Sequence, residues 1–369
     1  MAAPWDAVQR EVRERQASAA IAASPESVRH LAGVHFASQV MIRRRFAFVV
    51  IPATGEPMLL VQAVLEGTAR SRGLIPDVAT YVTGPVEGLA AQLAQRGLDR
   101  GALLVELDFL PAADARRLAS LVPDARVEDA GELFRSRRQV RLPNDLREHE
   151  RCARAAERAI QIAFSLAAGG DATERQVYAR MQDAMLTIGG GVIPFITLAS
   201  GAERTLDVHA HPSSRLIDRG DLLRVDCVGF FSGLYTDMAR TVVIGEATPD
   251  QRAMYRRVRA VQKDVVAFLR PGVPAGAVYE YFLERVKARG VSFAYRYVGH
   301  SVGYGVVEDP VMTPDVHDPL LPGMVLCVEV MDRVPGLGAV HLEDMLVLTE
   351  DGPQVWTGIM AADELPEYG

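Results

Sequence analysis

Short apolar runs alternate with amphipathic segments over the first third of the chain. FAFVVIPATGEPMLLV (46–61) predicts a β-hairpin around Thr54-Gly55, and GALLVELD (101–108) predicts a buried strand. PVEGLAAQLAQRG (85–97) predicts a helix that ends at Gly97, and AADARRLASLV (112–122) predicts another helix. This alternation predicts an N-terminal α/β domain over residues 1–140.

The pattern changes after an arginine-rich connector, FRSRRQVRLPNDLR (134–147), which Pro143 interrupts. Asn144 or Asp145 is expected to cap the next helix, with Glu148 completing a capping box. A second helix follows from about 172 to 188, and then come two extended runs around the turn at 231–233. The same order of two helices and then strands recurs from Pro249 to the C-terminus. Residues 141–369 are therefore predicted to form an α+β domain with an internal duplication.

Composition excludes several classes of protein. The chain has 369 residues, 49% of them hydrophobic, with a formal net charge of −7, so it has the material for large cores but no basic surface for nucleic acid. No apolar run approaches the roughly 18 residues of a membrane span, and the start MAAPWDAVQREVRE lacks a signal-peptide layout. Three cysteines without metal-type spacing fit reduced thiols. We expect a cytoplasmic protein that binds neither nucleic acid nor membrane.

Two pairs of acidic residues lie at symmetric positions in predicted hairpins. Asp226 and Asp237 are equidistant from the turn at 231/232, and Glu329 and Glu343 are equidistant from Gly336. Each pair is therefore expected to lie directly opposite and to point to one face of its sheet. Apolar flanks predict buried strands, where opposed carboxylates need a positive partner. Lysine and arginine are scarce in these strands, so a bound cation is the simplest partner.

A histidine with glycines around it completes the candidate site. His300 lies in VGHSVGYGVVEDP (298–310), where an imidazole on a strand with glycines around it can approach such a cluster closely. Four carboxylates and one imidazole suit Mn²⁺, Fe²⁺, Co²⁺ or Zn²⁺. Four carboxylates are more than one ion usually takes, so two ions roughly 3.5–4 Å apart fit better. Cys327, on the face of Glu329, is interpreted as a packing residue.

These segments carry a family resemblance. GDLLRVDCVGFFSGLYTDMARTVV (220–243), GHSVGYGVVEDP (299–310), VEV (328–330) and VHLEDMLVLTEDG (340–352) resemble the metal-site motifs of the metallopeptidase family that includes prolidase, aminopeptidase P, methionine aminopeptidase and the metal-free creatinase. The resemblance implies a pita-bread fold with pseudo-twofold symmetry for residues 141–369 and a creatinase/prolidase-type α/β domain for residues 1–140. It also implies two divalent ions, with Mn²⁺ favoured over Co²⁺, Zn²⁺ or Fe²⁺, and a homodimer.

The resemblance also implies roles for individual residues. Asp226 would chelate one metal ion, His300 and Glu329 the other, and Asp237 and Glu343 would bridge the two. Glu329 would act as the general base for a metal-bridging hydroxide that attacks a carbonyl carbon. His209 takes the place of a substrate-facing histidine, and His211 is the alternative.

The residues around the ligands depart from the pattern of family members that cleave Xaa-Pro bonds. Val307 replaces a histidine and Val330 a proline. Arg333 replaces a tyrosine and His341 an arginine, and both remain candidates to bind substrate. One hypothesis is that Arg333, with Arg296 on the strand before His300, pairs with the carboxylate of a dipeptide.

Three functions follow from this reading. The first is an Xaa-Pro metallopeptidase, a dipeptidase in preference to an aminopeptidase. The second keeps the metal site but changes the substrate to a non-peptide amide or osmolyte, as in ectoine-type hydrolysis or a lyase reaction. The third is a pita-bread binding module without metal, which the full set of five ligands disfavours because four buried carboxylates would then lack a partner.

Overall fold

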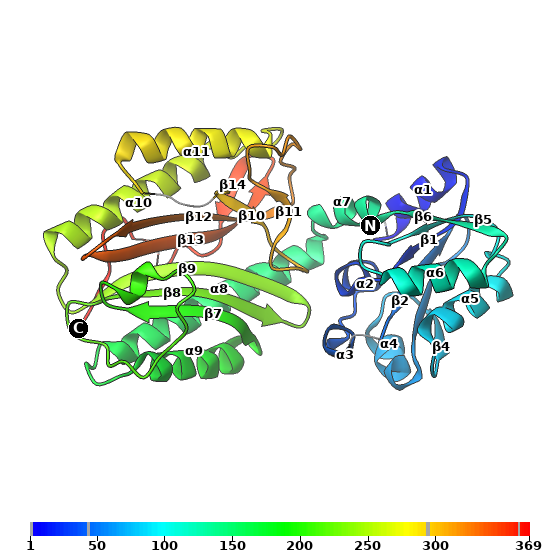
Figure 1. Ribbon diagram of the computed structural model, residues 1–369, viewed down its shortest axis with the longest axis horizontal. Helices are drawn as coiled ribbons and strands as arrows, with labels where there is room; N and C mark the ends of the chain where they lie inside the picture. The colour runs from blue at the N-terminus through cyan, green and yellow to red at the C-terminus, as the bar shows by residue number, and fades with distance from the viewer. Residues whose placement is uncertain (1–2, 43–44, 293–295, 361) are drawn as a thin grey trace. The chain divides into compact units, whose positions relative to one another are not determined.

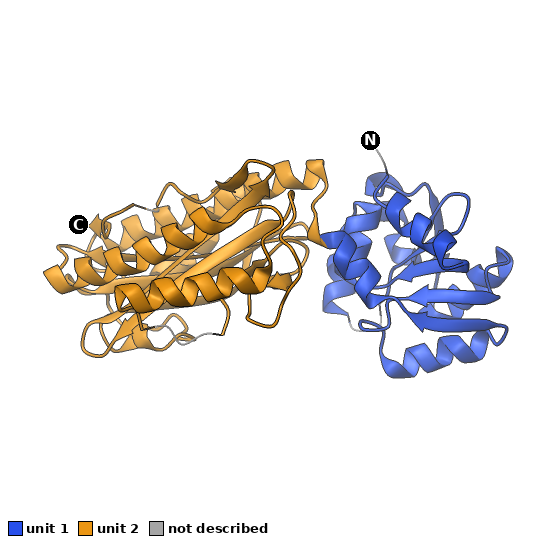
Figure 2. Ribbon diagram, turned by 90° about the horizontal axis from the view of Figure 1, so that it is seen from above, with its two compact units in different colours: residues 1–138 blue, residues 139–369 orange. Residues whose placement is uncertain are grey.

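The computed structural model describes residues 3–42, 45–292, 296–360 and 362–369. The chain divides into two compact units, residues 1–138 and 139–369, coloured separately in Figure 2. None of the described helices is both long and apolar enough to cross a membrane.

Unit 1 is built on a six-stranded sheet in the order β4-β3-β2-β1-β5-β6. β1–β2 and β2–β3 are antiparallel and the other pairs are parallel, so the predicted hairpin at 46–61 is present as β2–β3. The strands are β1 (Ala17–Ala22), β2 (Phe48–Pro52), β3 (Met58–Gln62), β4 (Asp77–Tyr81), β5 (Gly101–Val105) and β6 (Ala125–Asp129). The helices are α1 (Asp6–Glu14), α2 (Pro25–Ala32), α3 (Ala37–Met41), α4 (Glu66–Arg72), α5 (Pro85–Gln95), α6 (Ala112–Leu121) and α7 (Gly131–Gln139), with a short 3₁₀ turn η1 (Ala63–Leu65).

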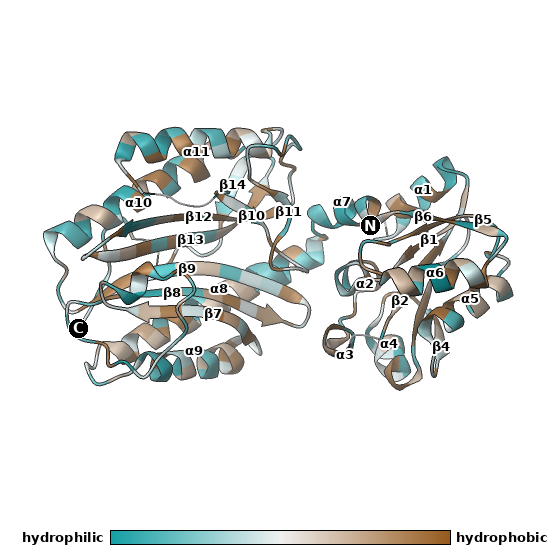
Figure 3. Cartoon of the chain, viewed as in Figure 1, coloured by the Kyte–Doolittle hydropathy of each residue, from teal (hydrophilic) through white to brown (hydrophobic). Residues whose placement is uncertain are grey.

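Helices cover both faces of this sheet. Alternate residues of β1 enter different cores: Ala20 and Ala22 pack with α1, α2 and α7, whereas Ala19 and Ile21 pack with α5 and α6. The strands at the centre of the sheet are accordingly hydrophobic along their length (Figure 3). A sheet buried on both sides explains why these strands read as continuous apolar runs in the sequence.

Unit 2 repeats one arrangement of helices and sheet. Its first half contains α8 (Pro143–Ala167), α9 (Glu174–Gly189), β7 (Val192–Ser200), η2 (Arg204–Leu206), β8 (Leu222–Phe231) and β9 (Leu234–Ile244). Its second half contains α10 (Pro249–Phe268), α11 (Ala275–Arg289), β10 (Gly299–Ser301), β11 (Glu308–Val311), β12 (Val325–Val334), β13 (Gly338–Thr349), β14 (Gly352–Val355) and β15 (Glu367–Tyr368).

The strands of unit 2 form two sheets, in the orders β15-β9-β8-β7 and β11-β10-β12-β13-β14. One core lies between the first sheet and α8 and α9, and the other between the second sheet and α10 and α11. β9 and β13 lie side by side where the sheets meet (Figure 1), and His341 and Thr241 exchange hydrogen bonds there. This duplicated α+β arrangement is the pita-bread fold, as expected from the sequence.

The start of α8 differs from the prediction. Pro143 is the first helical residue and Leu142 is the cap, without a side-chain hydrogen bond, so neither Asn144 nor Asp145 caps the helix. The fixed φ of proline suits the first helical position, which explains the earlier start. Asp145 instead accepts a hydrogen bond from the Tyr304 hydroxyl, at 2.6 Å. The carboxylate thus ties α8 to the segment that follows His300.

Candidate active site

Glu329 and Glu343 face each other across the β12–β13 hairpin. They are directly paired in its antiparallel register, as the symmetry about Gly336 predicted. Glu329 is 6% exposed and Glu343 is 2% exposed. Two carboxylates are therefore held at close range with little access to water.

Asp226 and Asp237 are not directly opposite, so that part of the prediction was wrong. Asp226 pairs with Ala239, and Asp237 pairs with Val228. The turn consists of Ser232 and Gly233, which both have positive φ, rather than being centred between residues 231 and 232. A two-residue turn of this kind shifts the register by two positions. Because side chains alternate along a strand, both aspartates still point to the same face.

His300 reaches the carboxylates from β10, a strand that a larger neighbour would displace. A Cβ atom at Gly299 would overlap the carbonyl group of Cys327 on β12. The His300 Nδ1 atom lies 3.0 Å from the Ser301 carbonyl oxygen, which only accepts, so Nδ1 carries the proton. The Nε2 lone pair is then available, and Nε2 lies 3.9 Å from carboxylate oxygens of both Asp237 and Glu343.

The five predicted ligands converge on one cluster. Ligand atoms of Asp226, Asp237 and Glu343 all lie within 4.8 Å of one another, and Glu343 also belongs to equally compact groups with His300 and with Glu329. Among the described residues, Asp237 Oδ1 and Glu343 Oε1 are buried without a hydrogen-bond partner. Buried carboxylate oxygens of this kind need a cation or a donor. The residues present therefore fit a divalent metal centre.

The electrostatics of the cluster are those of crowded carboxylates. Burial, followed by the charges of neighbouring carboxylates, raises the pKa of Asp237 and of Glu343 well above the ordinary range. Burial acts to raise the pKa of Glu329 as well, but the hydrogen bond and charge of His341, followed by the charge of His300 and the hydrogen bond from Tyr297, outweigh it and hold that pKa below its ordinary value. Glu329 is thus the carboxylate of the cluster best suited to remain ionised.

Two further side chains lie in the cluster. His341, expected to face substrate, has its Nε2 atom 3.1 Å from Glu329 Oε2 and is 2% exposed. Cys327, interpreted as a packing residue, offers its sulfur within 4.8 Å of ligand atoms of His300 and Glu343. Burial and the Glu343 charge raise the pKa of the Cys327 thiol. The sequence already placed Cys327 on the same face of its strand as Glu329, and this was the signal that could have placed its sulfur in the cluster.

A buried carboxylate that the sequence did not single out fixes the loop carrying His209. Glu174 accepts hydrogen bonds from the backbone and hydroxyl groups of Ser200 and Ser213, at 2.7–3.0 Å, and from Arg204. These serines precede and follow the loop, so one carboxylate holds both of its ends. His209 and His211 are both exposed.

Arg224 supports the same loop from the strand that carries Asp226. Its guanidinium donates to the Asp207 carbonyl oxygen at 2.7 Å and to the Thr197 hydroxyl at 3.1 Å. The Asp207 carboxylate in turn accepts from the His209 backbone N–H at 3.0 Å. The Arg224–Asp207 hydrogen bond therefore connects the loop to β8, the strand that carries Asp226.

The remaining candidates for substrate binding differ in position. Arg333 is partly exposed and lies on the face of β12 that carries Glu329. Arg296 is exposed and lies before β10, which begins at Gly299. The expectation that Arg296 lies on the strand leading to His300 was therefore wrong. Val307, in place of a histidine, is 58% exposed. Arg141 holds the segment before Val307 by donating to the Val302 carbonyl at 3.0 Å.

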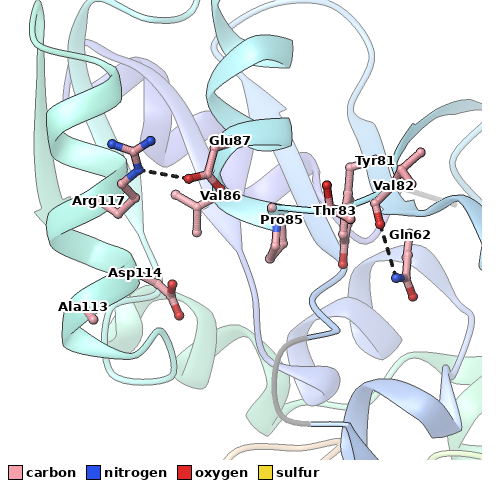
Figure 4. A pocket seen from close by; sticks show the side chains of 11 residues that line it. Gln62, Tyr81, Val82, Thr83, Pro85, Val86, Glu87, Ala113, Asp114 and Arg117 are labelled. Carbon is pink, nitrogen blue, oxygen red and sulfur yellow. Dashed lines mark hydrogen bonds and ion pairs between the residues drawn. The ribbon is translucent and has the colours of Figure 1, made fainter.

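Two hollows in the described structure are lined by residues outside this cluster. A cavity of about 520 Å³ in unit 1 is bordered by the start of α5, and the Arg117–Glu87 ion pair lies at its edge (Figure 4). The other, of about 500 Å³, is lined by α10 residues and the β12–β13 turn. Neither of these two hollows includes any of the five predicted ligands.

Comparison with known proteins identifies the family. Residues 147–350 match the model of metallopeptidase family M24, and residues 4–140 match that of the creatinase/prolidase N-terminal domain. The chain is 26% identical to the Xaa-Pro dipeptidase of Lactobacillus delbrueckii subsp. lactis over 95% of this chain and 96% of that protein. It is 28% identical to the Xaa-Pro dipeptidase of Pyrococcus furiosus over 60% of this chain and 64% of that one.

The fold has a close counterpart among solved structures. An Xaa-Pro dipeptidase from Bacillus anthracis superimposes with a TM-score of 0.86, covers 99% of each chain and shares 20% of its sequence. That identity supports the fold alone, whereas the family match spans more than half of the chain. With its duplicated pita-bread unit and its cluster of four carboxylates, the chain belongs to metallopeptidase family M24.

Proposed function

We propose that this protein is a dinuclear-metal hydrolase that cleaves the Xaa-Pro bond of dipeptides or short peptides. The observation that carries the proposal is the buried pair Glu329 and Glu343, joined in one cluster by Asp226, Asp237 and His300. Four carboxylates and an imidazole with a free Nε2 are a donor set for two divalent ions. Relatives named Xaa-Pro dipeptidase support the choice of substrate.

The ligand roles proposed from the resemblance agree with the positions of the side chains. Asp237 and Glu343 have carboxylate oxygens at equal distances from His300 Nε2, as bridging ligands would. Asp226 shares a compact group with both of these carboxylates. Mn²⁺, Co²⁺, Zn²⁺ and Fe²⁺ all suit such a set. When bound, the ions would activate a water nucleophile and polarise the scissile carbonyl group.

The chain's own residues then perform the proton transfer and orient the substrate. Glu329 is the carboxylate of the cluster best suited to remain ionised, and it is the proposed acceptor for the proton of the attacking water. The loop between Ser200 and Ser213 presents His209 or His211 to the substrate, and Glu174 fixes that loop. Arg333 would pair with the carboxylate of a dipeptide. We also propose a homodimer, as implied by the family resemblance.

A substrate panel tests this function. Chain stripped of metal and reloaded with Mn²⁺, Co²⁺ or Zn²⁺ is assayed with an Xaa-Pro dipeptide, the matching Xaa-Ala dipeptide, an Xaa-Pro tripeptide and a non-peptide amide. We expect hydrolysis of the Xaa-Pro dipeptide at the highest kcat/KM. Turnover of the non-peptide amide alone would overturn the peptidase assignment and favour the second function, which the altered residues Val307, Arg333 and His341 support.

A further inference from the structure

His341 occupies a position inside the carboxylate cluster that a structural histidine would not need. It is 2% exposed, and its ring lies in a compact donor group with Glu329 and Glu343. Thr241 fixes the residue from β9 because its hydroxyl accepts from the His341 backbone N–H at 2.9 Å and donates to the His341 carbonyl at 3.1 Å. The imidazole is therefore held toward the carboxylates from a rigid strand.

The ring is also incompletely paired. Nε2 lies 3.1 Å from Glu329 Oε2, and Nδ1 is buried without a hydrogen-bond partner among the described residues. An unpaired buried nitrogen costs about 1–3 kcal/mol. The Nδ1 atom of His300, by contrast, is paired with the Ser301 carbonyl. The unpaired Nδ1 of His341 can carry the ring proton, which leaves the Nε2 lone pair available for a metal ion.

The spacing between His341 and Glu329 is that of two neighbouring metal ligands. Two donors at adjacent positions of an octahedral ion, each about 2.1 Å from the metal, are about 3.0 Å apart. The observed separation of 3.1 Å differs little from this value. A metal ion can therefore take the place of the Nε2 proton with a small movement, and that proton transfers to the unpaired Nδ1.

We propose that His341 is a sixth metal ligand, so that the centre has two imidazoles, His300 and His341, in separate donor groups that share Glu343. The proposal rests on the dinuclear centre proposed above. It has a consequence for metal selection, because imidazole favours Co²⁺, Zn²⁺ and Fe²⁺ over Mn²⁺, which prefers carboxylate oxygen. The chain should accordingly bind Co²⁺ more tightly relative to Mn²⁺ than a centre with one imidazole.

Cobalt binding tests the proposal without reference to turnover. Each imidazole bound to Co²⁺ gives one strongly shifted, exchangeable N–H proton resonance. The Co²⁺-loaded wild type should show two such resonances, and H341Q and H341R should each show one. The ratio of Co²⁺ to Mn²⁺ affinity, from calorimetry, should fall by roughly tenfold or more in both variants. H317Q, at an exposed histidine outside the cluster, is the matched control.

The outcomes separate the two proposals. One shifted N–H resonance in the wild type, with an unchanged affinity ratio in H341Q and H341R, would show that His341 only donates to Glu329 and would overturn the sixth-ligand proposal. A wild-type chain that binds neither Co²⁺ nor Mn²⁺ at micromolar concentration would instead overturn the dinuclear centre itself. Two variants are used because they replace the imidazole differently: glutamine is neutral, and arginine keeps a donor to Glu329. If one variant fails to fold, the other still tests the proposal.

Discussion

Glu329 and Glu343 occupy directly paired positions on neighbouring antiparallel strands, and both are almost completely buried. Like charges at such a position are destabilising unless something positive lies between them. This relationship links the hairpin to the proposed chemistry, because the same pairing that makes the metal-free cluster costly also aligns two ligands for one centre.

Glu174 is predicted to position the substrate loop rather than to bind metal. In E174Q the amide can no longer accept from every donor at Ser200 and Ser213, so the ends of the loop loosen. We expect kcat/KM for an Xaa-Pro dipeptide to fall by roughly tenfold to a hundredfold, while the metal content stays at the wild-type value. E203Q, at an exposed glutamate of the same loop, should match the wild type. Full activity in folded E174Q would refute the role of this carboxylate.

Arg333 is predicted to recognise the carboxylate of short substrates. It lies on the Glu329 face of β12 and is partly exposed, so a dipeptide in the site could reach it. R333A should raise KM for an Xaa-Pro dipeptide far more than for a longer peptide, whose carboxylate lies elsewhere. R296A provides a comparison at the exposed arginine before β10. Equal effects of R333A on both substrate lengths would contradict a carboxylate contact.

Arg240 is predicted to be essential for stability because its charge is buried with two acids. Its guanidinium lies 3.1 Å from Glu157 and 2.7 Å from Asp344, and it also donates to the Glu343 carbonyl. R240M would leave the buried Glu157 carboxylate without a charged partner and Asp344 with Arg259 alone, at a cost of about 3–5 kcal/mol in the free energy of unfolding. R256M removes an exposed pair and should cost no more than about 1 kcal/mol. Urea denaturation compares them, and similar costs would contradict this prediction.

His149 gives a prediction about pH. Burial, together with the nearby Arg141 charge, lowers its pKa to about 3, and its Nε2 lies 2.6 Å from the Tyr235 carbonyl with the Trp356 ring alongside. The unfolded chain binds a proton near pH 6.5 and the folded chain does not, so stability is complete above that pH and falls on acidification towards pH 3. The slope is about 1.4 kcal/mol per pH unit.

A variant isolates that contribution. H149Q should show a shallower dependence of unfolding free energy on pH between about 6.5 and 3 than the wild type, even if its stability at neutral pH is lower. Chemical denaturation at a series of pH values, with metal absent throughout, gives both slopes. Parallel slopes for the two proteins would mean that the folded chain protonates His149 and that the burial argument is wrong.

The sequence predicted strand pairing and the order of helices and strands correctly where residues close together in the chain determine them. The spacing of Glu329 and Glu343 about Gly336 gave their pairing correctly because strands alternate faces and the turn lies at the midpoint. The pairing of Asp226 was missed by two residues because it depends on Ser232 adopting a positive φ, which is uncommon outside glycine. The alternation of helices and strands gave both fold classes for the same local reason.

Contacts between distant segments could not be obtained in this way. The hold of Glu174 on a loop 26 to 39 residues away depends on how α9 packs against β7 and the segment that follows it. The choice between His209 and His211 likewise depends on a substrate's position, and both side chains are exposed. These features follow from tertiary structure rather than from spacing or periodicity.

The most direct test of the proposed function couples metal content to proline release in one variant. D237N keeps the shape of the side chain but removes a charge from the cluster, and D318N, at an exposed aspartate outside it, is the control. Wild type and D318N should bind two Mn²⁺ or Co²⁺ ions per chain and release proline from an Xaa-Pro dipeptide only when loaded, and D237N should lose both properties. Proline release that persists in D237N, or in wild type stripped of metal by a chelator, would contradict the proposed dinuclear mechanism.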